Sequence, residues 1–89
     1  YEQDEALQAD VLRELSAHFD EYADFHAIRL RRDTNRLYIE IFLEFDPEKK
    51  MRQVQQSINN IKRSLETKIK NSEVLIIPTL REGADSTCN

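Results

Sequence analysis

Two histidines and a few carboxylates are the side chains of this sequence that could bind a metal ion. His26 is the first candidate, because a neutral imidazole is a good ligand for borderline divalent metals. A tight site takes three or four ligands, and no other histidine or cysteine stands near His26 in a ligand spacing. Strand alternation would place His26 with Ile28 and Leu30. His26 is therefore either a metal ligand or a histidine at the edge of the core.

His18 and three acidic residues are further candidates for this role. His18 lies beside Phe19 in a predicted helix, where it could approach His26 or face solvent. Carboxylate oxygens suit harder cations, and the residues that could supply them are Glu40, Glu44 and Asp46. Carboxylates that alternate along a strand also form its solvated face, so both interpretations stay open.

The sequence offers little for catalysis. Cys88 stands near the C-terminus, and a reactive thiol needs a positioned, electropositive site that no pattern here supplies. A single cysteine also rules out a disulfide within one chain and fits a reducing compartment. We find no nucleophile with a base, no phosphate loop and no glycine-rich cradle. The sequence therefore predicts a protein that is not an enzyme.

Length and charge narrow the class of partner. The chain has 89 residues and a net charge of −4, which fits one small acidic domain. Nucleic-acid binders normally present a basic face, so the charge argues against such a partner. Four arginines nevertheless form a basic cluster in the predicted hairpin: Arg29, Arg31, Arg32 and Arg36. This cluster would suit phosphates or anionic lipids, or it could pair with acidic residues across a hairpin.

No segment of the sequence is built to cross a membrane. Its apolar runs are far shorter than the ~20 residues that span a bilayer, and the sequence shows no signal-peptide pattern. The sequence begins with Tyr1 rather than methionine. We read this start as the sign of a piece of a longer protein.

Hydrophobic periodicity sets out five elements. A helical stripe of apolar residues predicts a first helix that ends near Tyr22. Alternation predicts strands at 25–32 and 37–45, joined by a polar turn at 33–36. A second stripe predicts a helix from 47 or 48 to 70, capped by Asp46 with Pro47 in its first position. A strand at 74–77 follows and is stopped by Pro78, and residues 79–89 are predicted to be a disordered tail.

The order helix-strand-strand-helix-strand predicts an α+β fold for residues 1–78. The hairpin is antiparallel, and the strands that flank the second helix should be parallel through a right-handed crossover. The result is a two-layer, ferredoxin-like sandwich with a mixed three-stranded sheet and both helices on one face. The other face would carry Tyr38 and Phe42 among glutamates. Two exposed aromatics suggest a dimer interface, although antiparallel sheets also tolerate a solvated face with a few aromatics.

Three short motifs in this order resemble the C-terminal cytoplasmic domain of cation diffusion facilitator transporters. "DFHAIRLRRDTN" is similar to the family pattern "VHDLRTRRSG" at His26, Ile28, Arg29 and Arg31. "YIEIFLEFDP" is similar to the strand "FVELHLEVDP", and "EVLIIPTL" loosely matches a last strand, "DVTIHVEP". The resemblance covers most of the chain, from about Leu15 to Pro78.

The resemblance implies a homodimeric domain on the cytoplasmic side of a membrane, below a six-helix unit of the same chain that is absent here. Such transporters export zinc, manganese, iron or cobalt, usually against protons. In many members the domain binds a divalent metal near the dimer interface, and binding regulates transport.

The sequence departs from the family at most of its metal ligands. Where members carry histidines, this chain has Phe42 in the second strand, about Gln55 in the second helix and Pro78 in the last strand. Asn35 stands near the place of a turn glycine. Only His26 matches a ligand position, so the resemblance implies a retained dimer scaffold and a mostly lost metal cluster.

Two alternatives to an exporter domain remain open at this point. One is a free-standing ferredoxin-like module for protein interaction or small-ligand binding. The other is an RNA-binding α+β domain, suggested by the arginines and disfavoured by the acidic charge and the lack of interleaved aromatic and basic residues.

Overall fold

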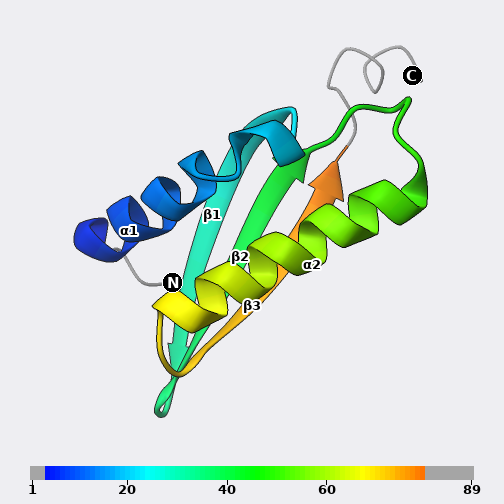
Figure 1. Cartoon of the computed structure of the whole chain (residues 1–89). Coiled ribbons are helices and arrows are strands. Elements are labelled where there is room, and N and C mark those ends of the chain that lie inside the picture. The colour runs from blue at the N-terminus through cyan, green and yellow to red at the C-terminus, as the bar shows by residue number, and fades with distance from the viewer. Residues whose placement is uncertain (1–3, 80–89) are drawn as a thin grey trace, which may run out of the picture.

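The computed structural model describes residues 4–79 and contains the five predicted elements in the predicted order (Figure 1). They are α1 (Glu5–Ser16), β1 (Asp24–Asp33), β2 (Arg36–Glu44), α2 (Met51–Lys68) and β3 (Ser72–Thr79), with a short 3-10 helix η1 (Phe19–Glu21) after α1. The strand order is β1-β2-β3, with β1 antiparallel and β3 parallel to β2. Both helices cover one face of this mixed sheet, which confirms the two-layer α+β sandwich.

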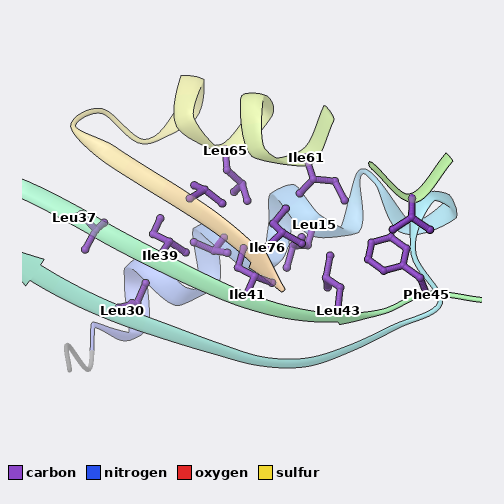
Figure 2. Close-up of a cluster of buried hydrophobic side chains, with 13 residues drawn as sticks. Leu15, Leu30, Leu37, Ile39, Ile41, Leu43, Phe45, Ile61, Leu65 and Ile76 are labelled. Atoms are coloured by element: carbon purple, nitrogen blue, oxygen red, sulfur yellow. The ribbon is translucent and has the colours of Figure 1, made fainter. Parts of the chain in front are cut away.

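The core lies between the helices and the sheet. The predicted alternation of β2 is confirmed, because Leu37, Ile39, Ile41, Leu43 and the following Phe45 are all buried. They meet the apolar stripes of both helices (Figure 2), chiefly Val11, Leu15, Ile61 and Leu65. These elements come from distant parts of the sequence and share one core, which supports the sheet that carries the site described below.

The first helix is shorter than predicted. Its first turn is capped by Asp4, whose Oδ1 accepts the N–H of Leu7 at 3.0 Å, and the helix ends at Ser16. Tyr22 turns back toward the helix and donates its hydroxyl to the carbonyl oxygen of Leu15 at 3.1 Å. The chain between them coils tightly as η1, so Phe19 leaves the apolar stripe and is 71% exposed.

The start of α2 and the end of β3 also differ from the prediction. Asp46 does not cap α2 but closes a turn, accepting the N–H of Glu48 on Oδ1 at 2.9 Å, and the helix begins at Met51. Pro78 does not stop β3, because β3 is an edge strand, where a residue without an N–H is tolerated. β3 therefore reaches Thr79. Residues 80–89 of the predicted tail lie outside the described part of the chain.

Candidate functional site

The sheet face opposite the helices is the candidate site, and we call it the open face. Strand register defines its members, because paired residues share a face and alternate with the buried ones. They are Asp24, Ala27, Arg29, Arg31 and Asp33 of β1, Arg36, Tyr38, Glu40, Phe42 and Glu44 of β2, and Glu73, Leu75, Ile77 and Thr79 of β3. The sequence prediction that Tyr38 and Phe42 share this face with two glutamates therefore agrees with the register.

Two arginines lie over the two aromatic rings. The guanidinium carbon of Arg31 is 4.5 Å from the centroid of the Tyr38 ring, and that of Arg29 is 5.1 Å from the centroid of Phe42. These are cation–π distances. Both rings are half-buried as a result. The basic cluster is thus engaged with its own sheet, and the predicted cross-strand pairing is supported by the Arg29–Glu40 register.

The open face carries apolar residues that the sequence reading did not assign to it. Ile77 pairs with Phe42 in the parallel register, and Leu75 pairs with Glu40. Leu75 is 54% exposed, while its neighbours Val74 and Ile76 are buried. The run at 74–77 gave no period from which to separate two faces. The missing signal was the register with β2, which assigns alternate residues of this run to opposite faces.

His26 also lies on the open face, contrary to the strand-parity prediction. A β-bulge shifts the β1–β2 register, so that Phe25 pairs with Leu43 and Ala27 pairs with Phe42. One extra residue in β1 reverses the alternation on its N-terminal side. Phe25 therefore packs against the core, and His26 turns away from it.

His26 contacts a nearly buried carboxylate. Its Nε2 lies 3.0 Å from Oε1 of Glu44, and the two side chains are 34% and 7% exposed. A carboxylate accepts hydrogen bonds, so Nε2–H donates and Nδ1 holds the free lone pair of the neutral ring. A carboxylate that orients a histidine in this way is also found behind many metal-binding imidazoles.

The described residues of one protomer do not form a closed metal site. Within residues 4–79, no three histidine, cysteine, aspartate or glutamate side chains are grouped closely enough to hold a metal ion. Glu40 lies opposite Arg29 in the sheet, and the Asp46 carboxylate accepts the N–H of Glu48 in the turn before α2. His26 and Glu44 remain as two donor residues, fewer than the three or four of a tight site.

His18 belongs to a separate polar cluster between α1 and α2. Its Nδ1 lies 2.8 Å from Oε2 of Glu21, and its Nε2 lies 3.9 Å from Oε2 of Glu14. Burial acts to raise the pKa of Glu21, but hydrogen bonds with His18, Asn60 and Ser57 outweigh it and leave the pKa below its usual value. Since His18 binds within the helix layer, the structure does not bring it to His26 on the open face.

Comparison with solved structures supports the fold. A structure of CzrB, described there as a candidate zinc transporter, superposes with a TM-score of 0.82 at 12% identity, covering 90% of this chain and 99% of that one. A nickel form of a MamM C-terminal domain variant superposes with a TM-score of 0.76 at 18% identity, covering 89% of this chain and 100% of that one. A cadmium form of another MamM C-terminal domain variant superposes with a TM-score of 0.75 at 18% identity, covering 88% of this chain and 98% of that one. No curated protein matches the sequence.

The family assignment rests on a match over most of the chain. A protein-family model described as "Cation efflux protein, cytoplasmic domain" matches residues 4–76. This is a family of transporter domains and not of catalytic enzymes. None of the helices in the described residues has the length and apolar character needed to span a membrane. The chain belongs to the family of cytoplasmic domains of cation efflux proteins.

Proposed function

We propose that this domain joins two copies of a divalent-cation exporter through the open face and thereby regulates transport. The observation that carries the proposal is a sheet covered by helices on one side only, with Phe42, Leu75 and Ile77 on the other. An apolar surface of this kind marks an interaction site when it is continuous. The family to which the chain belongs is also a family of dimerisation domains.

A second copy of the same chain is the occupant that fits this surface. The open face combines the apolar residues Phe42, Leu75 and Ile77 with two arginines on β1 and Glu73 on β3, so it offers both charges to a two-fold partner. In a two-fold contact the same patch meets itself, and opposite charges at its two margins can face each other. The small size of the domain adds a reason, because a chain of 89 residues buries a modest share of its own surface.

The transported cation would cross the membrane in another part of the same protein. Under this proposal the domain lies on the cytoplasmic side, attached to a transmembrane unit that exchanges a divalent cation for protons. The dimerising domain then ends with β3, at Thr79. The similar solved structures include a nickel form and a cadmium form of MamM C-terminal domain variants.

Regulation by metal would need both copies. Within the described residues, one protomer joins His26 and Glu44 but groups no third donor with them, so a closed site on the open face requires donors from the partner. We therefore expect no tight zinc binding by the monomeric domain. Isothermal calorimetry with zinc, manganese and iron tests this on the parent and on His26→Ala, both at concentrations below self-association. Sub-micromolar binding to the monomer that is lost in His26→Ala would overturn the expectation.

Sedimentation velocity over a range of concentrations tests the dimer. Phe42→Glu places a charge at the centre of the open face and should shift the protein to a monomer. The matched control is Phe19→Glu, which changes an aromatic residue that is 71% exposed in the helix layer and should leave the dimer intact. A parent that stays monomeric at high concentration, or a dimer that survives Phe42→Glu and dissociates in Phe19→Glu, would contradict the proposal.

A further inference from the structure

The free edge of β3 is covered by two charged side chains of α2. β3 pairs with β2 on one side only, so the backbone groups of alternate residues point outward. Val74 is one of these residues. Its N–H donates to Oε2 of Glu66 at 2.9 Å, and its carbonyl oxygen accepts from Nζ of Lys62 at 3.0 Å.

The two side chains also bind each other. Lys62 and Glu66 are one helical turn apart, and Nζ of Lys62 lies 2.6 Å from Oε2 of Glu66. The hydrogen bond from Lys62, followed by that from the Val74 backbone, lowers the pKa of Glu66. One carboxylate and one ammonium group thus satisfy the donor and the acceptor that Val74 presents at the edge.

Pro78 removes a second donor from the same edge. Residue 78 has the parity of Val74, so its backbone nitrogen also points away from β2. Proline has no N–H and cannot join a further strand at this position. Between Val74 and Pro78, the edge keeps an outward N–H only at Ile76.

Strand addition needs a row of free backbone donors and acceptors along an edge. We infer that the Lys62–Glu66 pair closes the β3 edge to strand addition by another chain, so that copies of this domain associate without extending the sheet. This inference concerns the edge of the sheet and does not depend on the open-face dimer.

The test replaces the pair with apolar residues of similar length. Methionine is a good helix former that neither donates nor accepts well, so Lys62→Met/Glu66→Met should keep α2 and uncover Val74. The matched control, Arg63→Met/Thr67→Met, places the same two residues at the same spacing on the exposed side of α2. Both pairs are made in the Phe42→Glu background, so the result is independent of association through the open face.

Two measurements on these proteins report on the edge. Light scattering should find species that grow with concentration in the Lys62/Glu66 variant and none in the control. Hydrogen exchange followed by NMR should find the Val74 amide exchanging roughly tenfold faster or more in that variant. Glu66→Gln, which keeps a carbonyl acceptor for Val74, should retain most of the protection.

Association of the edge variant and its control to the same extent would overturn the inference, because the added methionines alone would then be the cause. An unchanged exchange rate of the Val74 amide in the edge variant would contradict it as well. If Lys62→Met/Glu66→Met loses the circular dichroism signal of its helices, light scattering and hydrogen exchange on the single variant Glu66→Met take its place as the test.

Discussion

His26→Ala removes the donor that His26 provides to a nearly buried carboxylate. The Glu44 side chain is 7% exposed, and its Oε1 lies 3.0 Å from Nε2 of His26. A hydrogen bond to a charged group contributes about 1.5–3 kcal/mol when buried. The His26 side chain is 34% exposed, so solvent screens part of this contribution. We expect a loss of about 1 kcal/mol in the free energy of unfolding, or ~4–8 °C in the melting temperature.

His26→Gln separates this structural contact from a metal-binding role. A glutamine amide can donate to Glu44 as the imidazole does, so its stability should lie within about 0.5 kcal/mol of the parent. Glutamine is a poor ligand for borderline metals, so any metal effect that depends on His26 should be lost in both variants. Urea and thermal unfolding, followed by circular dichroism with and without a chelator, measure both properties.

Two results would refute this reasoning. An alanine variant as stable as the parent would mean that the 3.0 Å contact contributes nothing to stability. A glutamine variant as unstable as the alanine variant, with a parent that a chelator destabilises to the same level, would assign the stability to a bound metal ion instead.

Three further predictions follow from individual contacts. The pKa of Glu66 is lowered from 4.5, so Glu66 adds stability above pH 4.5 and loses it as the pH falls through the lowered value. Glu66→Gln should therefore cost ~0.5–1 kcal/mol in urea unfolding at pH 7, and the cost should shrink as the pH falls below 4.5. Burial, with the charge of Asp24, raises the pKa of Tyr22 above 10.0, so Tyr22→Phe should remove a late-titrating phenol from the ultraviolet titration curve. Ile41 is fully buried, and Ile41→Ala should lower the free energy of unfolding by about 2–5 kcal/mol.

The element order and most of the core could be predicted from the sequence. The alternation from Leu37 to Phe45 has the period of a strand with one buried face, and the apolar residues at its odd-numbered positions are all buried. The stripe of α2 likewise predicts Val54, Ile61 and Leu65 as core residues, and they are buried. These patterns are local, so they need no knowledge of which elements pack together.

The exact ends of the helices could not be predicted in the same way. Asp46 and Pro47 form a suitable helix start by residue type, yet the chain uses Asp46 to close a turn before Lys50. The end of α1 depends on the bond from Tyr22 back to Leu15, which only the folded chain brings together. Capping preferences identify suitable residues but do not choose among several neighbouring ones.

The candidate site was predicted in part. Tyr38 and Phe42 follow the strand period, but His26 does not, because a bulge of one residue reverses the face of every residue before it. Leu75 and Ile77 required the parallel register with β2. The Lys62–Glu66 cover of β3 joins residues of two elements and has no local signature beyond an ordinary helical ion pair.

Hydroxyl-radical footprinting of the parent protein, at concentrations below and above self-association, tests most directly whether two copies meet through the open face. Side chains on that face should lose reactivity as the concentration rises, notably Phe42 and the 54% exposed Leu75. Phe19 and Met51, which are 71% and 76% exposed, should react equally at both concentrations. Protection of Phe19 or Met51 with unchanged reactivity of Phe42 and Leu75 would contradict the account.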